Sequence, residues 1–208
     1  MREITYVALG DSTAVGVGAR TGGGYPDRLL PRLRRLRPQL RLVNLGESGA
    51  TSSDVLRTQV PRALRQKPAL VTIAVGINDV GLQIPEEAFA RNLEEIVIAL
   101  NKLSAPTALA NLPDLAHSPA VSRLVPTAYY ERRLELYNKH VEATAARHGL
   151  LLLDLWRISR ETLPDHPEYF SPDGFHPSAE GYEAWAEGME PEVASLLTDT
   201  RSNSRMIP

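Results

Sequence analysis

The stretch ITYVALGDST, residues 4–13, joins a run of apolar and β-branched residues to a polar turn. A continuous apolar run of this length, bounded by glycine and polar residues, is typical of a strand that is buried on both faces. Four further runs of the chain have the same character. We therefore expect five strands, over residues 4–9, 40–45, 70–75, 107–112 and 150–153.

Longer segments with helical spacing lie between these runs. In the segment 86–103, Phe89, Leu93 and Ile96 recur at intervals of three or four residues and define one apolar face. Parallel strands need long crossovers, which are usually helical, so this alternation predicts an α/β fold with a mostly parallel sheet and helices on both faces. The predicted helices cover residues 25–36, 53–65, 86–103, 127–147 and 178–197.

Length and composition restrict the class of protein. The 208 residues suit one domain over 1–197, followed by a polar, aperiodic tail over 198–208. The net charge is −2, so there is no basic excess to bind nucleic acid. Cysteine is absent, which excludes a cysteine nucleophile and a thiolate zinc site. The apolar runs are too short to span a membrane and no secretory signal is evident, so we expect no membrane insertion and a cytoplasmic location unless an export signal was removed. Oligomeric state stays open.

Three polar turns follow the first three predicted strands, over residues 10–13, 46–49 and 76–79. The carboxyl ends of parallel strands meet at one edge of a sheet, where ligands bind in open α/β folds. Taken singly, Ser12 suits a helix N-cap, Gly49 suits a turn with positive φ, and these turns have ordinary structural roles. Their shared position at one edge is what points to chemistry.

Read together with the segment Asp173-Gly174-Phe175-His176, these turns contain the parts that acyl transfer requires. A serine hydroxyl is a weak nucleophile and needs a neighbouring base, which His176 can supply to Ser12. The base in turn needs an acceptor that orients it, and Asp173 lies three residues away across a glycine turn. Gly49 and Asn78 are candidate donors to the oxyanion, through a backbone N–H and a side-chain amide respectively.

At this point the sequence resembles a known family, the SGNH (GDSL-type) esterases and lipases. The resemblance rests on four blocks in the family's order, Gly10–Thr13, Asn44–Thr51, Gly76–Asp79 and Asp173–Pro177. It implies that Ser12 is the nucleophile, that Ser12, Gly49 and Asn78 form the oxyanion hole, and that Asp173 and His176 are the acid and the base. One departure is Thr13, where the family more often has leucine.

The resemblance also implies a three-layer α/β/α, flavodoxin-like fold and a cofactor-free enzyme without a metal. Its expected partner is a small-molecule carboxylic ester, with a short to medium acyl chain or an O-acetyl group. The small residues Thr13 and Ala14 beside the nucleophile favour such chains. The irregular stretch 113–126 follows the fourth predicted strand, and it either walls a substrate pocket or is an ordinary surface connector.

Two other functions remain open on the residues alone. One is a flavodoxin-like module that binds a nucleotide or flavin near Gly16-Val17-Gly18, although a complete phosphate-binding motif is absent. The other is a metal-dependent phosphoesterase that uses Asp11, Asp79 and His176. We favour a structural role for Asp11 and Asp79, which can hold the loops around Ser12 and Asn78 through hydrogen bonds. An α/β-hydrolase is disfavoured because its nucleophile motif requires glycine where Ala14 stands.

Overall fold

A computed structural model describes residues 3–198. Its centre is a five-stranded sheet with the order β2-β1-β3-β4-β5, and every pairing of neighbouring strands is parallel. This arrangement confirms the α/β prediction and has the flavodoxin-like strand order that the resemblance implies. The strands are β1 Ile4–Gly10, β2 Leu40–Asn44, β3 Leu70–Ala74, β4 Thr107–Ala110 and β5 Leu151–Leu153.

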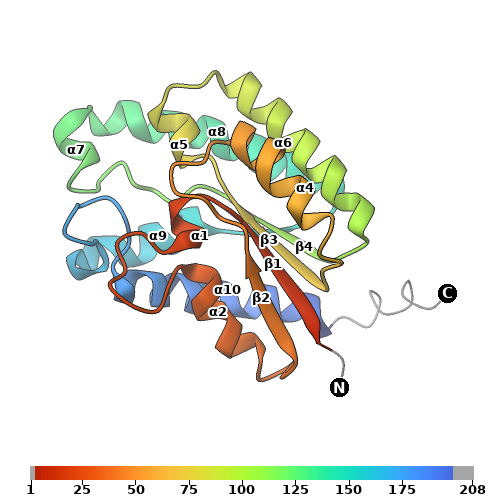
Figure 1. The fold of residues 1–208 in the computed structure, drawn as a ribbon. Helices are drawn as coiled ribbons and strands as arrows, with labels where there is room; N and C mark the ends of the chain where they lie inside the picture. The colour runs from red at the N-terminus through yellow and green to blue at the C-terminus, as the bar shows by residue number, and fades with distance from the viewer. Residues whose placement is uncertain (1–2, 199–208) are drawn as a thin grey trace.

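Helices cover both faces of the sheet (Figure 1). The helices α2, α9 and α10 pack on one face, and α4, α6 and α8 pack on the other. The α-helices are α1 Ser12–Val15, α2 Tyr25–Leu33, α3 Ser52–Asp54, α4 Val60–Ala63, α5 Ile77–Gly81, α6 Glu86–Leu100, α7 Val121–Leu124, α8 Thr127–His148, α9 Leu155–Thr162 and α10 Ala179–Thr198. A π-helix, η1 Val55–Gln59, joins α3 to α4, and the 3₁₀ turns are η2 Asn101–Leu103, η3 Leu163–Asp165 and η4 Pro167–Tyr169.

The sheet separates two hydrophobic cores. Along β1, Val7 and Leu9 pack into the core beneath α6 and α8, whereas Tyr6 and Ala8 pack into the core beneath α2 and α10. All four side chains are fully buried. A strand with helices on both faces has no solvent side, which is why its sequence is continuously apolar and does not alternate.

The structure differs from the predicted elements in several places, among them the short helices α1, α5 and α7, which were not predicted, and β4, which ends at Ala110 instead of residue 112. The predicted helix over 53–65 is interrupted by η1, whose backbone bonds span five residues. The eight-residue α9 was not predicted, because it is short and carries charged residues between its apolar ones. It begins at the N-cap Asp154, which accepts a hydrogen bond from the backbone N–H of Arg157.

The end of the chain is described only in part. The helix α10 continues to Thr198, one residue into the segment that the sequence assigns to the tail. The rest of that segment, residues 199–208, lies outside the described residues. The assignment of residues 1–197 to a single hydrolase domain stays a prediction.

Candidate active site

Ser12 lies where β1 ends and the short helix α1 begins. Gly10 makes this turn possible, because it pairs with Ala74 of β3 and, at its φ of +155°, a Cβ would lie 2.3 Å from the Ala74 carbonyl oxygen. The Asp11 side chain caps α1 by accepting hydrogen bonds from the backbone N–H and the hydroxyl of Thr13, both at 2.9 Å. The unusual Thr13 therefore uses its hydroxyl to hold Asp11.

The Ser12 hydroxyl is hydrogen-bonded to His176, which is 164 residues away in the sequence. The Ser12 Oγ to His176 Nε2 distance is 3.0 Å, and the His176 Nδ1 to Asp173 Oδ2 distance is 2.7 Å. Both ring nitrogens of one imidazole are thus engaged, one by a hydroxyl and one by a carboxylate. The structure therefore brings three of the predicted site residues into one hydrogen-bonded chain.

Asp173 is held in place by the turn that contains it. Its Oδ1 accepts hydrogen bonds from the backbone N–H groups of Phe175 and His176 and from the Ser171 hydroxyl, at 2.8–2.9 Å. Burial by itself raises the pKa of Asp173, but the His176 ring and these donors outweigh it and hold the pKa well below its usual range. Asp173 is therefore an ionised acceptor that fixes the orientation of the imidazole.

Ser171 is a residue that the sequence analysis missed. A serine two residues before an aspartate is a common local pattern, so only the carboxylate it contacts gives it a place in this site.

The structure also explains why residue 18 is a glycine. It lies at φ +93°, and a Cβ there would be 2.8 Å from the His176 Cβ. Gly18 thus packs against the histidine loop, and a Cβ at Gly16 would lie 2.4 Å from the Gly24 backbone nitrogen, so packing explains both glycines without a bound phosphate.

The remaining predicted residues lie on two adjoining loops. The Asn78 side-chain amide donates a hydrogen bond to the Ala50 carbonyl oxygen at 2.9 Å, which ties the end of β3 to the loop that carries Gly49. Gly49 has φ +80° and is exposed, and no atom lies within 4 Å of the position a Cβ would take. Within residues 3–198, the second N–H of the Asn78 amide has no acceptor. Both groups can therefore donate to a ligand.

Asp79 is hydrogen-bonded to Ser52, which follows the loop that carries Gly49. Its buried carboxylate accepts hydrogen bonds from the Ser52 backbone N–H at 2.9 Å and from the Ser52 hydroxyl at 2.6 Å. Burial raises the pKa of Asp79. Asp11 and Asp79 thus have the loop-holding contacts that we favoured. Within residues 3–198, no three acidic or histidine side chains gather in a way that would hold a metal ion.

Burial of Asp11 leads to a prediction about stability. Burial is the main cause that raises the pKa of Asp11 from 3.8 to about 6. Between pH 3.8 and about pH 6, Asp11 is protonated in the folded protein and ionised in the unfolded chain. The free energy of unfolding therefore falls as the pH rises through this range, by on the order of 3 kcal/mol. Asp11→Asn cannot ionise, and we expect its free energy of unfolding to rise relative to wild type over this range. Urea unfolding from about pH 4.5 to about pH 7.5 checks this. A constant difference between the two proteins would contradict it.

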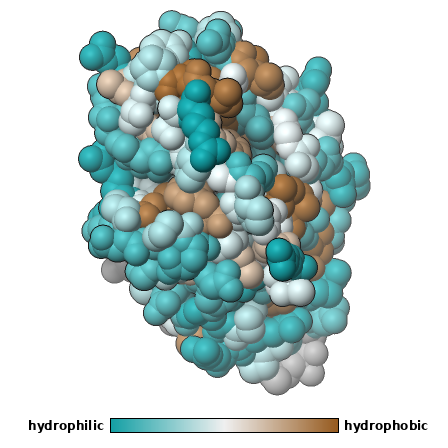
Figure 2. Space-filling view, turned by 90° about the vertical axis from the view of Figure 1, so that its left-hand side faces the viewer, coloured by the Kyte–Doolittle hydropathy of each residue, from teal (hydrophilic) through white to brown (hydrophobic). Residues whose placement is uncertain are grey.

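An apolar groove lies beside Asn78, with a volume of about 390 Å³. Two exposed leucines contribute to it, Leu82 at 65% and Leu124 at 82% of their full exposure. Figure 2 views the side of the molecule that carries α7 and shows apolar residues gathered in the upper part of a hydrophilic surface. The groove is lined by Ile77, Asn78, Gly81, Leu82, Ala120, Val121, Leu124, Val125, Tyr130 and Phe175.

Two features connect this groove to the predicted site. Phe175 lines the groove and packs edge-on against the His176 ring, with the ring centroids 5.1 Å apart. Four residues of the groove come from the irregular stretch 113–126. That stretch therefore walls a pocket, and its role in binding substrate stays a prediction.

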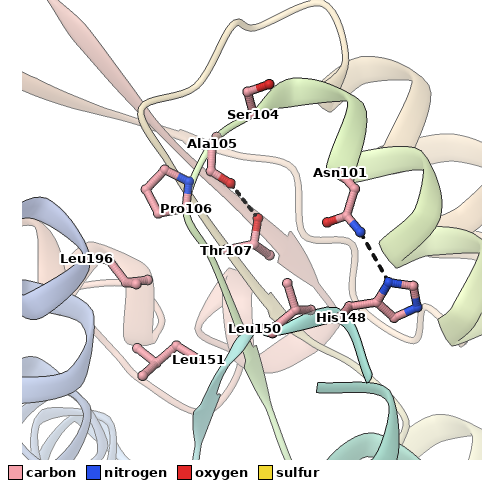
Figure 3. A pocket seen from close by; sticks show the side chains of 10 residues that line it. Asn101, Ser104, Ala105, Pro106, Thr107, His148, Leu150, Leu151 and Leu196 are labelled. Carbon is pink, nitrogen blue, oxygen red and sulfur yellow. Dashed lines mark hydrogen bonds between the residues drawn. The ribbon is translucent and has the colours of Figure 1, made fainter. Parts of the chain in front are cut away.

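A further cavity, of about 530 Å³, lies at the opposite edge of the sheet (Figure 3). It is formed where β4 and β5 begin, and Leu196 of α10 contributes to it. Asn101 and His148 are hydrogen-bonded at its rim, with 3.3 Å between the Asn101 Nδ2 and the His148 Nδ1. Ser12 follows the carboxyl end of β1, so this cavity is separated from the candidate site by the length of the sheet.

A hydroxyl, an imidazole and a carboxylate linked in series at the carboxyl edge of a parallel sheet are the arrangement found in serine hydrolases. A family model described as the GDSL-like Lipase/Acylhydrolase family matches residues 8–184, and the chain belongs to this family. It is accordingly a carboxylic ester hydrolase of the esterase and acylhydrolase type. The match confirms the resemblance and does not favour a nucleotide-binding module or a metal-dependent phosphoesterase.

Known proteins similar to the chain agree with this assignment. Esterase TesA of Pseudomonas aeruginosa is 25% identical over 193 residues, which cover 93% of this chain and 89% of that protein. The crystal structure of TesA superimposes with a TM-score of 0.75 and 25% identity, covering 92% of this chain and 99% of that one. A putative GDSL-like lipase from Parabacteroides merdae gives a TM-score of 0.80 at 17% identity, with 94% and 97% covered. The last comparison concerns the fold alone.

A structure of the acetylxylan esterase Axe2 from Geobacillus stearothermophilus, a catalytic mutant, also shares the fold. Its TM-score is 0.75 at 23% identity, with 91% of this chain and 94% of that chain covered.

No helix among residues 3–198 combines the length and the apolar character that crossing a bilayer would require.

Proposed function

We propose that the protein hydrolyses carboxylic esters through a covalent acyl-enzyme formed on Ser12. The observation that carries this proposal is the hydrogen-bonded chain from the Ser12 hydroxyl through the His176 ring to the Asp173 carboxylate. Such a chain lets a hydroxyl act as a nucleophile, because the imidazole removes its proton as the new bond forms. Family membership makes ester hydrolysis the reaction, and the three residues supply its mechanism.

In the first half of the reaction, the Ser12 oxygen bonds to the ester carbonyl carbon while its proton moves to the His176 Nε2. The C–O bond to the alcohol then breaks, the alcohol leaves with that proton, and the acyl group remains on Ser12. Water repeats these steps on the acyl-enzyme and releases the acid. Asp173 stays ionised throughout, because its depressed pKa matches the role of stabilising the charged imidazole.

The oxyanion of each tetrahedral intermediate would accept hydrogen bonds from three donors. These are the backbone N–H groups of Ser12 and Gly49 and the second N–H of the Asn78 amide. Gly49 suits this role because nothing stands where its Cβ would be, so a substrate oxygen can approach the main chain. Asn78 suits it because the bond to Ala50 fixes the plane of the amide before substrate arrives.

The groove beside Asn78 would take the acyl chain. An apolar surface next to an oxyanion donor favours a hydrocarbon substituent on the carbonyl carbon, since its burial is worth about 0.8 kcal/mol per methylene. A groove of about 390 Å³ is large enough for a short or medium chain. This supports esters of such acids as substrates, with acetyl esters as the smallest members of the series.

The test of the mechanism is covalent labelling. The wild-type protein should react with a fluorophosphonate at a single site, which peptide mass spectrometry should locate at Ser12, and it should hydrolyse p-nitrophenyl esters equally with and without a chelator. The control Ser195→Ala removes an exposed serine of α10 and should label normally. Labelling at another serine, or loss of turnover with the chelator, would reject the proposal.

The proposed role of the groove in binding the acyl chain can be tested by replacing Gly81 with a larger residue. This residue lies at the exposed end of α5, lines the groove, and has open space where a Cβ would be, so the backbone accepts a side chain there. We expect Gly81→Leu to lower kcat/KM for a decanoate ester relative to an acetate ester by about 10-fold or more. Gly81→Ala is the matched control and should change this ratio little. An unchanged ratio in Gly81→Leu would show that the acyl chain lies elsewhere.

A further inference from the structure

We propose that Gln59 is a positioning residue for the nucleophile, an inference that rests on the proposed role of Ser12. Gln59 belongs to the π-helix η1 and is completely buried. Its Oε1 accepts a hydrogen bond from the Gly10 backbone N–H at 2.8 Å, and its Nε2 donates one to the Gly10 carbonyl oxygen at 2.7 Å. Gly10 stands two residues before Ser12, so one side chain holds both polar groups of the main chain that leads into the nucleophile.

The end of β1 needs such a partner. The paired register of β1 and β2 ends at Ala8 opposite Asn44, after which the Leu45 N–H still donates to the Ala8 carbonyl oxygen at 2.8 Å. Beyond this point, the one backbone hydrogen bond that Gly10 makes on that side within residues 3–198 is from the Glu47 N–H, which donates to the Gly10 carbonyl oxygen at 3.2 Å. A carboxamide carries one donor and one acceptor at the spacing of a peptide group. Gln59 therefore takes the place of a neighbouring strand for the Gly10 N–H, and it gives the Gly10 carbonyl oxygen a second donor beside the Glu47 N–H.

The π-helix η1 places the Gln59 side chain on the buried side of this segment. The Val60 backbone N–H bonds to the Val55 carbonyl oxygen, five residues back, where an α-helix would bond four residues back. The extra residue in the turn leaves the consecutive residues Gln59 and Val60 both buried. A π-turn is rare and is frequently found at functional sites. Here it adds an inward-facing amide to an otherwise apolar helix face.

The consequence for catalysis is geometric. Ser12 and His176 come from opposite ends of the chain, and their 3.0 Å contact depends on where β1 ends. Misplacement of a reacting group by about 1 Å can cost on the order of 100-fold in rate. A buried residue that locks Gly10 on its open side therefore sets the Ser12 to His176 distance, without contact with substrate.

The experiment compares Gln59→Leu with Tyr6→Phe. Tyr6 also lies on β1 and is fully buried, and its hydroxyl is hydrogen-bonded to Thr72 far from the nucleophile turn, so Tyr6→Phe removes a buried hydrogen bond of the same strand. We expect Gln59→Leu to lower kcat for p-nitrophenyl butyrate by about 10- to 100-fold at nearly unchanged KM, and to slow fluorophosphonate labelling of Ser12 by the same factor. Tyr6→Phe should lower Tm but leave both rates near those of wild type.

Conservative variants complete the design. Gln59→Glu, whose protonated carboxyl keeps one donor and one acceptor, should recover most of the rate that Gln59→Leu loses. If Gln59→Leu does not fold, Gln59→Asn takes its place, because it keeps the amide but is one methylene too short to reach Gly10. A folded variant with lowered Tm and unchanged kcat and labelling rate would overturn the proposal. Failure of the wild-type protein to label at Ser12 would instead reject the proposed function on which the inference rests.

Discussion

Replacing Ser12 with alanine should lower kcat for p-nitrophenyl butyrate by about 10⁴- to 10⁶-fold, the range expected when a nucleophile that acts with a base is removed. The Ser12 hydroxyl has one protein partner among the described residues, His176, so its removal should leave the fold intact. His176→Ala should cost a similar factor. The double variant should lose no more than either single one, because the serine and the histidine act as a unit.

The measurement compares kcat for the wild-type protein, the three variants and the control Ser195→Ala, after circular dichroism and thermal unfolding have established that all are folded. Any residual rate should be insensitive to fluorophosphonate in the Ser12→Ala protein. Retention of more than about a hundredth of the wild-type kcat by folded Ser12→Ala would mean that Ser12 is not the nucleophile, since a positioning effect alone can reach about 100-fold.

The second large effect is expected at Asn78. If its free N–H donates to the oxyanion, Asn78→Ala should lower kcat by about 10²- to 10³-fold with little change in KM, because that hydrogen bond forms fully only in the transition state. The variant also loses the bond to the Ala50 carbonyl oxygen, which joins two loops. A modest decrease in Tm is therefore expected as well.

A neighbouring asparagine supplies the control for this experiment. The Asn92 side chain donates to the Ser52 hydroxyl at 3.0 Å in the same loop network, without an N–H directed at a substrate position in our mechanism. Asn92→Ala should lower Tm and leave kcat within about threefold of wild type. If both variants lower Tm and neither lowers kcat by more than that, Asn78 is a structural residue and the oxyanion must be held by backbone donors alone.

Much of the fold could be predicted because burial on both faces leaves a strong mark in sequence. The runs around Val7 and Val71 are continuously apolar, as strands between two helical layers must be, and both form interior strands of the sheet, β1 and β3. The long α6 and α8 show their apolar faces over several turns. In contrast, α9 covers two turns only, too few for periodicity to separate it from a loop.

Some residues of the candidate site could be predicted from the sequence and others could not. Ser12 and His176 belong to local motifs, so their residue types and the order of their blocks are visible in the sequence. Ser171 and Gln59 are not visible in this way. Each matters through a single partner, the Asp173 carboxylate and the Gly10 main chain respectively, and neither partnership leaves a repeat or a motif.

The amino-acid sequence by itself determined the layered α/β class, the parallel sheet and the turns that carry Ser12, Asn78 and His176, because hydrophobic periodicity and turn chemistry act over short distances along the chain. Only the tertiary structure decided the 3.0 Å contact between Ser12 and His176, the π-turn at Gln59 and the apolar groove beside Asn78. The physical reason is that these features join segments far apart in sequence, where packing of the two cores determines which side chains meet.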